Sequence, residues 1–486
     1  MMTFRSMAFG VLLVCMAAGA TASGAPVAAE AGQDTSSAAG AWTGRISLPP
    51  GPLEIAVALA QDAATRAWTG SIDIPAQGAK GLPLGGIAID GRAVAFDIAG
   101  IPGKPTFSGT LSGDGTSITG TFSQNGATFP FELRRGGTAT VAPPPPRPQE
   151  PRPPFPYREE QVVYRNEAAA VRLAGTLTLP QGAGPFPAVL LITGSGSQDR
   201  DNTILGHKSF LLLADTLTRR GIAVLRVDDR GIGGSDRGTM EPTTADLAGD
   251  VRAGVALLDG RADIDSNHIG LIGHSEGGVI APMVAADDPR VRFIVMLAGN
   301  GLPGEELMML QIAAIAGTQK VPKAVIDWDL SMRRRVYDLI QSEADGEPNE
   351  AAREALIESI EPIPGVPDRE VARQNVRLLL AGSSGRWFRY FLAHDPRPVL
   401  QRVTVPVLAL IGSNDRQVPA AENLAAIREA LEAGGNRNAV VRELPGLNHL
   451  FQTSQTGAPD EYARIEETMA PAALTLIADW VVEQTR

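Results

Sequence analysis

Short runs that alternate between large apolar residues and small or polar ones dominate residues 41–135. Two clear examples are Leu53–Leu59 and Ala93–Ile98. Alternation with a period of two is typical of strands that bury one face. Residue pairs that favour tight hairpin turns separate these runs, at Asp90-Gly91, Asp114-Gly115 and Asn125-Gly126. We therefore predict a small antiparallel β domain over 41–135, built as a sandwich or a barrel.

A loose repeat supports this prediction. An aromatic or branched residue, a small residue and a glycine recur near the start of predicted strands, as Trp42-Thr43-Gly44, Trp68-Thr69-Gly70, Phe107-Ser108-Gly109 and Ile118-Thr119-Gly120. The tryptophans could line a ligand-binding face, but large aromatic side chains bury most area in a core. We expect them to pack inside the domain.

Proline marks the end of this domain. The stretch Val141–Pro156 contains Pro143–Pro146 and Pro153-Pro154. Such runs favour the polyproline II conformation and behave as semi-rigid spacers. Residues 136–156 are therefore predicted to be a linker between two domains.

The hydrophobic pattern changes from Tyr157 to Arg486. Continuous apolar runs typical of buried strands occur at Ala188–Thr193, Ala223–Val227, Ile269–Ile272, Phe293–Leu297, Val407–Ile411 and Ala439–Glu443. Longer stretches with helical periodicity separate them, at His207–Arg219, Thr244–Leu258, Gly277–Ala286, Ala420–Ala433 and Pro471–Glu483. This alternation predicts an α/β domain over 157–486, with a mostly parallel sheet covered on both faces. Residues 302–395 interrupt it with a largely helical stretch, which we interpret as an insertion that caps the sheet.

The first residues resemble a targeting signal. Arg5 precedes the uncharged apolar run Met7–Ala20, and Ala20-Thr21-Ala22 forms an A-x-A pattern. These features predict a secretory signal peptide over 1–22, and hence an exported protein, periplasmic or secreted. The apolar run is too short to span a membrane, and nothing else in the chain is apolar enough to do so.

Composition narrows the function classes. The net charge of −11 disfavours binding to a nucleic-acid backbone, so we expect no nucleic-acid partner. The single cysteine, Cys15, cannot form an intramolecular disulfide or a cysteine zinc site. No metal-binding motif and no dinucleotide fingerprint occurs, so the sequence predicts no metal and no cofactor. It carries no signal for an oligomeric state.

The clearest chemical motif follows the predicted strand Ile269–Ile272. Gly273–Gly278 reads G-H-S-E-G-G, and a predicted helix comes next. A G-x-S-x-G sequence between a strand and a helix is typical of a nucleophile elbow, where glycines make room for a strained serine. Ser275 is therefore the candidate nucleophile.

A serine hydroxyl needs a base, and the base needs a carboxylate that fixes its tautomer. His449 lies just after the strand Ala439–Glu443, and Asp415 follows the strand Val407–Ile411. Both loops lie at carboxyl ends of strands, where open parallel sheets place their sites. We expect at least three of the other four histidines to be ordinary surface residues; they are His207, His268, His274 and His394.

Backbone donors for an oxyanion can also be predicted. The strand Ala188–Thr193 ends in Gly194-Ser195-Gly196-Ser197, a turn that can direct N–H groups into the site. The N–H groups of Ser195 and of Glu276, the residue after the nucleophile, are the two candidates. Asp228-Asp229-Arg230 nearby is interpreted as a turn whose ion pair fixes the loop beside the elbow.

Taken together, these motifs resemble bacterial α/β-hydrolases of the EstD esterase type, often grouped with serine aminopeptidase-like hydrolases. The resemblance rests on four segments over about 160–486: Thr193–Asp201, Gly206–Lys208, Asp228–Ser235 and Gly273–Gly278. It implies an α/β-hydrolase fold and carboxylic-ester hydrolysis, with Ser275, Asp415 and His449 at the positions of the family triad. The chain departs from many lipases in having Thr193-Gly194 where they carry His-Gly.

The leading hypothesis is thus a serine esterase acting on small or medium acyl chains through an acyl-enzyme. Trp387 and Phe388, at the end of the insertion, are candidates for the substrate pocket. A peptidase or amidase using the same triad is the alternative, because carboxylates in the insertion could hold a substrate amine; Glu305, Glu306, Asp327 and Asp329 are such residues. A non-catalytic binding protein on the same scaffold is a third hypothesis.

Overall fold

The computed structural model describes residues 38–47, 52–62, 65–75, 79–98, 105–124, 127–136, 146–343 and 347–486. The predicted signal peptide with Cys15, the Asn125-Gly126 turn and the linker residues 137–145 lie outside this described part. The described residues form two compact units, 38–136 and 146–486. Within them, no helix is both long enough and apolar enough to cross a membrane.

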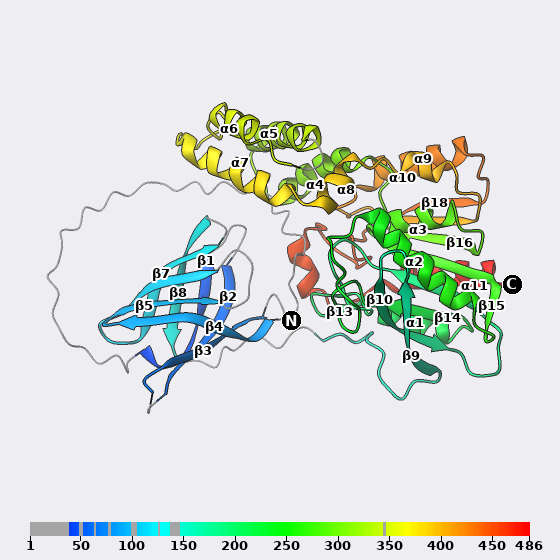
Figure 1. The fold of residues 1–486 in the computed structure, drawn as a ribbon, viewed down its shortest axis with the longest axis horizontal. Coiled ribbons are helices and arrows are strands. Elements are labelled where there is room, and N and C mark those ends of the chain that lie inside the picture. Colours follow the sequence, from blue (N-terminus) through cyan, green and yellow to red (C-terminus); the bar gives the residue numbers. More distant parts are fainter. Residues whose placement is uncertain are drawn as a thin grey trace. The chain divides into compact units, whose positions relative to one another are not determined.

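The first unit is a closed barrel of eight antiparallel strands, which decides between the two architectures left open by the sequence. Each strand pairs with the next, and β1 pairs with β8 to close the barrel. The strands are β1 (Gly40–Ser47), β2 (Pro52–Gln61), β3 (Trp68–Ile74), β4 (Ala79–Asp90), β5 (Ala93–Ile98), β6 (Thr106–Leu111), β7 (Ser117–Gln124) and β8 (Ala127–Arg135). Figure 1 shows this barrel in blue and cyan.

The sequence repeat builds the barrel interior. Trp42 is fully buried, and its indole N–H donates to the carbonyl of Ala38 at 3.1 Å. Gly109 and Gly120 lie opposite each other in the β6–β7 pair. A Cβ on Gly120 would come within 2.1 Å of the Ser108 carbonyl oxygen, so only glycine fits there. The repeat is therefore a packing feature, and Trp42 is a core residue as expected.

The second unit contains an eight-stranded sheet in the order β18-β17-β16-β15-β11-β14-β10-β9. Its strands are β9 (Arg158–Asn166), β10 (Val171–Leu179), β11 (Phe186–Ile192), β14 (Ala223–Val227), β15 (Ile264–His274), β16 (Val291–Leu297), β17 (Val407–Gly412) and β18 (Ala439–Leu444). The last six of these are parallel, whereas β10 pairs antiparallel with both β14 and β9. The mostly parallel α/β sheet predicted from the sequence is confirmed, with two further strands at one edge.

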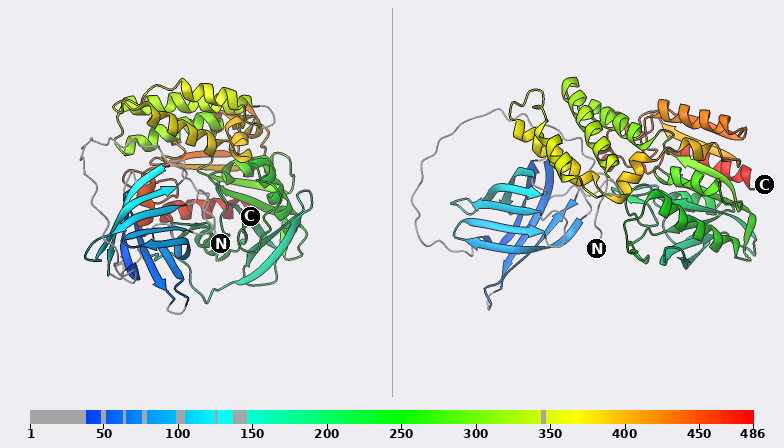
Figure 2. Two further views of the ribbon diagram at one scale, coloured as in Figure 1. Left: turned by 60° about the vertical axis from the view of Figure 1, so that its left-hand side comes forward. Right: turned by 45° about the horizontal axis from the view of Figure 1, so that its top comes forward.

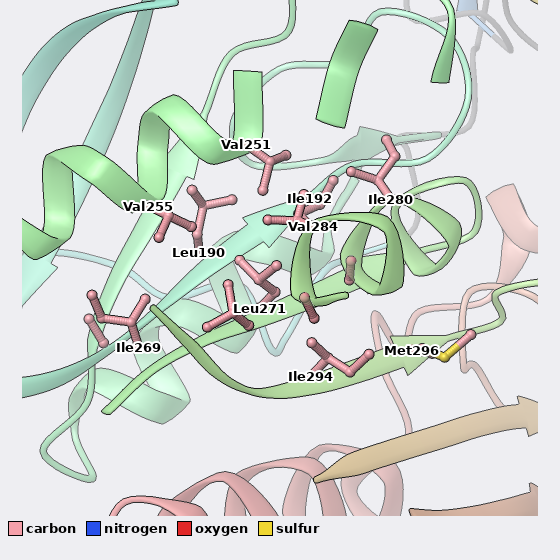
Figure 3. Packing of buried hydrophobic residues seen from close by; sticks show 14 of the residues in the cluster. Leu190, Ile192, Val251, Val255, Ile269, Leu271, Ile280, Val284, Ile294 and Met296 are labelled. Carbon is pink, nitrogen blue, oxygen red and sulfur yellow. The ribbon is translucent and has the colours of Figure 1, made fainter. Parts of the chain in front are cut away.

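Helices cover both faces of this sheet. One face packs against α2 (Thr244–Asp259), α3 (Gly277–Ala285), α9 (Arg397–Leu400) and α10 (Ala420–Ala433). The other face packs against α1 (Ser209–Thr218) and α11 (Pro471–Gln484). Figure 3 shows side chains from neighbouring strands, such as Leu190, Leu271 and Ile294, facing Val255 and Val284 of the helices. This buried layer fixes the strand ends that carry the candidate site.

Five helices between β16 and β17 make up most of the predicted insertion. They are α4 (Gly304–Thr318), α5 (Lys323–Ser342), α6 (Glu350–Glu358), α7 (Arg369–Ser383) and α8 (Arg386–Ala393). Figure 2 shows them gathered in a layer of their own beside the sheet. Val336, Tyr337 and Ile340 of α5 are completely buried, so this layer has its own apolar core. We call it the cap.

The end of the proline-rich segment is attached to the second unit. The Arg147 guanidinium donates to the carbonyls of Leu205, Ala463 and Ile465 at 2.7–3.1 Å. Glu150 forms an ion pair with Lys208. These contacts bind residues 147–150 to the second unit ahead of Tyr157.

Candidate active site

Ser275 occupies a strained turn between β15 and α3. Its φ of +56° lies in the left-handed region, which residues other than glycine rarely adopt. The turn is crowded: a Cβ on Gly273 would lie 1.9 Å from the Gly277 carbonyl oxygen, and one on Gly277 would lie 2.2 Å from the Ile192 carbonyl oxygen. The backbone N–H of Ser275 donates to the Leu297 carbonyl of β16 at 2.8 Å. This is the geometry of a nucleophile elbow.

His449 and Asp415 are hydrogen-bonded to each other. The His449 Nδ1 lies 2.8 Å from Asp415 Oδ2, and neither side chain is more than 1% exposed. The other carboxyl oxygen accepts from the backbone N–H groups of Gln417 and Val418, both at 2.8 Å. A carboxylate can only accept, so the proton in this contact lies on Nδ1 of His449. Nε2 is buried and has no hydrogen-bond partner in the structure.

His274 joins the elbow to the loop that carries His449. Its Nε2 lies 2.9 Å from the His449 carbonyl oxygen, and the two rings are 4.9 Å apart. Since a carbonyl only accepts, Nε2 is the protonated nitrogen of His274. Burial, and next the proximity of His449, lowers the pKa of His274 to about 3, so its imidazole is neutral near pH 7.

The predicted oxyanion turn lies directly against the serine. A Cβ on Gly194 would come within 3.1 Å of Ser275 Cβ, so the turn after β11 lies directly beside Ser275. Ser195 follows with a half-buried side chain, and its carbonyl accepts from Gln198 Nε2 at 3.2 Å. The structure therefore places the turn that carries Ser195 beside the turn that carries Ser275 and Glu276.

The side chain of Glu276 connects the elbow to the cap. Its Oε1 accepts from Thr244 Oγ1 at 2.6 Å and from Trp387 Nε1 at 2.7 Å. Oε2 is buried and lacks a hydrogen-bond partner. Burial raises the pKa of Glu276, against the lowering effect of these two hydrogen bonds. Nothing in the sequence signals this contact, because Thr244 and Trp387 are distant from Glu276 along the chain.

The two pocket candidates occupy different surroundings. Trp387 is half-buried, bonds to Glu276 and stacks on Phe391 with ring centroids 5.4 Å apart. Phe388 is only 3% exposed and packs edge-on against Tyr337 at 5.5 Å. Trp387 thus lies at the elbow, whereas Phe388 belongs to the interior of the cap.

Most of the cap carboxylates considered for amine binding have other partners. Asp329 is paired with Arg333 at 2.9 Å, and Asp327 with Lys323 at 2.6 Å. Glu305 accepts from Gln341 Nε2 at 3.1 Å. Three of the four residues are therefore engaged within the cap itself.

The expectation that most remaining histidines are surface residues is wrong. His274 is only 5% exposed and His207 only 2%. His207 also lies in the short strand β13 (His207–Lys208), paired with β12 (Thr203–Ile204), rather than at the start of a helix. Its ring nitrogens contact Thr468 Oγ1 and the Tyr462 carbonyl, and burial lowers its pKa to about 4. Buried hydrogen-bonding networks of this kind depend on contacts distant in sequence, so periodicity could not reveal them.

Comparison with known proteins gives a consistent result. The profile of the alpha/beta hydrolase family matches residues 189–465. Esterase EstD of Thermotoga maritima is 26% identical over 312 residues, which cover 64% of this chain and 66% of the esterase. The chain thus spans just under two thirds of that relative's length.

Solved structures are similar at lower identity. The alpha/beta hydrolase GrgF from Penicillium sp. sh18 has 17% identity and a TM-score of 0.41, covering 68% of this chain and 99% of GrgF. Est1E from Butyrivibrio proteoclasticus, solved with ferulic acid bound, has 16% identity and a TM-score of 0.37, covering 66% of this chain and 96% of Est1E. The family profile alone covers more than half of the chain, including the segments that carry Ser275, Asp415 and His449, and the protein therefore belongs to the alpha/beta hydrolase family.

Proposed function

We propose that this hydrolase is a serine carboxylesterase that cleaves esters of small or medium acyl chains through an acyl-enzyme on Ser275. The observation that carries the proposal is the state of His449. Asp415 holds its Nδ1 at 2.8 Å, while Nε2 is buried without a partner. An imidazole oriented in this way is a base that lacks only its proton donor, and the elbow serine is the donor that the family uses.

Acylation follows from these positions. Ser275 Oγ attacks the ester carbonyl carbon while its proton passes to His449 Nε2. Asp415 stabilises the imidazolium and does not itself take the proton. The tetrahedral intermediate then collapses: the bond from carbonyl carbon to alkoxy oxygen breaks, and the alcohol leaves with the proton from His449.

Charge develops on the former carbonyl oxygen during this step. The backbone N–H groups of Ser195 and Glu276 are the proposed donors to that oxygen, and one such donor is worth roughly 3–4 kcal/mol. The close approach of Gly194 to Ser275 supports this assignment, because the turn lies beside the serine proposed to attack the carbonyl.

Deacylation repeats the chemistry with water. His449 removes a proton from a water molecule, whose oxygen attacks the acyl carbon. The ester bond to Ser275 Oγ breaks, the proton returns to the serine, and the carboxylic acid is released.

The contacts within the cap favour ester over aminopeptidase substrates. A substrate ammonium group needs an available carboxylate, and Asp327 and Asp329 are already paired with Lys323 and Arg333. The 26% identity to an esterase over 64% of this chain supports the same preference.

Two assays separate the three hypotheses. Labelling of Ser275 by a fluorophosphonate probe, lost in Ser275→Ala, would distinguish an enzyme from a binding protein. A panel of p-nitrophenyl esters, run beside aminoacyl anilides, would then distinguish an esterase from a peptidase. We expect turnover of the esters and little or none of the anilides; the reverse preference would overturn the proposal.

A further inference from the structure

The turn that carries the Ser195 N–H needs contacts that fix its conformation. It runs from Thr193 to Gln198, and Gly196 within it has a φ of +85°. Glycine-rich segments of this kind have many accessible conformations. An oxyanion donor must nevertheless be aimed before the charge develops, because reorganisation during the reaction would cost part of its benefit.

Asp229 lies in the loop after β14, the strand that pairs with β11, and it binds both ends of this turn. Its carboxyl group accepts from Thr193 Oγ1 at 2.8 Å and from the Gln198 backbone N–H at 2.8 Å. Its own backbone N–H donates to the Gln198 carbonyl at 3.0 Å. Asp229 is therefore hydrogen-bonded both to Thr193, at the start of the turn, and to Gln198, at its end.

A cavity of about 50 Å³ lies beside the turn, and Thr193, Gly194, Asp229 and Arg230 are among the residues that line it. The hydrogen bonds from Thr193 and Gln198 to Asp229 join the turn to the loop after β14.

Asp229 also differs from its charged neighbours. Asp228 is paired with Arg200, and Arg230 with Asp250, as expected for structural ion pairs. The carboxyl group of Asp229 instead accepts hydrogen bonds from the turn. Loss of hydration, opposed by the hydrogen bonds from Gln198 and Thr193, raises its pKa to about 8. Keeping such a group inside a protein is unfavourable, and positions of this kind occur preferentially at functional sites.

We propose that Asp229 is a positioning residue that holds the Thr193–Gln198 turn so that the Ser195 N–H points at the oxyanion. The proposal rests on the function proposed above, since it requires that a tetrahedral intermediate forms on Ser275. It extends the sequence-based interpretation of Asp228–Arg230 as an ion-paired turn, because the middle residue acts through hydrogen bonds to the oxyanion turn itself.

A positioning role predicts a specific kinetic pattern. The oxyanion exists in the transition state and not in the bound ester, so losing the donor lowers kcat and leaves KM nearly unchanged. Asp229→Ala should reduce kcat at least tenfold, and by about 10²–10³-fold if the donor is lost completely. Asp229→Asn should retain kcat within about threefold, because its amide can accept from Gln198 N–H and donate to Thr193 Oγ1.

The test measures kcat and KM for a p-nitrophenyl ester, together with the inhibition constant of an alkyl trifluoromethyl ketone. Addition of Ser275 Oγ to this ketone places a hemiketal oxygen at the oxyanion position. Its inhibition constant should therefore rise in Asp229→Ala by about the factor that kcat falls. Asp236→Ala is the matched control: Asp236 lies in the same segment but bonds to Arg172, and its loss should leave all three constants within twofold.

The outcomes are distinguishable. Unchanged kcat and ketone affinity in a folded Asp229→Ala would overturn this inference alone, as would equal losses in Asp229→Asn and Asp229→Ala. If Asp229→Ala does not fold, Thr193→Val decides: a lower kcat that Thr193→Ser restores supports the inference, and an unchanged kcat overturns it. An inactive wild-type protein would overturn the proposed function and this inference with it.

Discussion

His274 Nε2 donates a hydrogen bond to the backbone carbonyl of His449 at 2.9 Å. The residue before the proposed nucleophile thus anchors the loop of the proposed base. The tautomer is fixed because the acceptor is a carbonyl, and the lowered pKa of His274 keeps the ring neutral. Glu276, the residue after Ser275, accepts a hydrogen bond from Trp387 of the cap.

Removing the hydrogen bond from His274 should make the position of His449 less well defined. We expect His274→Phe, which keeps a ring but cannot donate, to lower kcat about tenfold, since small misplacement of a catalytic group is costly. His274→Gln carries an amide N–H and should recover part of the loss. Steady-state kinetics on a p-nitrophenyl ester would measure both, and equal kcat in wild type and His274→Phe would show that the contact does not position His449.

The same histidine should make stability depend on pH. Its pKa is about 3 in the folded protein against 6.5 as the reference value, so the unfolded chain binds the proton first as the pH falls. The contribution of neutral His274 to the free energy of unfolding is therefore complete above about pH 6.5. It falls by about 1.4 kcal/mol per pH unit between about pH 6.5 and about pH 3. Between pH 7 and pH 4.5, His274→Gln should lose roughly 2–3 kcal/mol less than wild type. Urea unfolding at both pH values tests this, and parallel losses would contradict it.

Trp387 and Phe388 should respond differently to substitution. Trp387→Phe removes the N–H that reaches Glu276 while keeping an aromatic ring, and should change the relative kcat/KM among acyl lengths with little loss of stability. Phe388→Ala should cost about 3–5 kcal/mol, because it empties part of the cap interior. A p-nitrophenyl ester series and thermal unfolding measure the two effects. An unchanged selectivity profile in Trp387→Phe would assign Trp387 to packing alone.

The barrel should be dispensable for the chemistry, since Ser275, Asp415 and His449 all lie in the second unit. A truncated chain starting at Pro146 should retain turnover of a small ester within about tenfold, or about 1.4 kcal/mol. A chain starting at Tyr157 loses the hydrogen bonds of Arg147 and the Glu150–Lys208 pair and should be less stable by roughly 2–4 kcal/mol. Inactivity of a folded Pro146 chain would show that the barrel contributes to the site.

Local patterns in the sequence were sufficient for the six parallel strands and the elbow. The parallel strands that continue as apolar runs, such as β16 and β17, are buried on both faces, so their composition identifies them. Strands β9 and β10 were both missed; in β9, charged residues from Arg158 to Glu160 interrupt the apolar pattern. The glycines around Ser275 are required by contacts within a few residues, and a short motif is enough to predict such a turn.

Contacts between distant segments could not be predicted in this way. Glu276 and Trp387 are 111 positions apart, and His274 and His449 are 175 apart, so no periodicity relates them. The burial of His207 likewise depends on Thr468 and Tyr462 near the end of the chain. The residues proposed to react were accessible to sequence reasoning, whereas those that position them required the fold.

The proposed unit of Ser275, His449 and Asp415 is tested most directly by turnover of the Ser275→Ala/His449→Ala double variant beside the two single variants. Residues that act as one catalytic unit fail to add, so each single variant should lose on the order of 10⁶ in kcat, and the double should be about as slow as either. Losses that multiply in the double variant, or near-wild-type turnover in folded His449→Ala, would contradict the assignment of His449 as the base for Ser275.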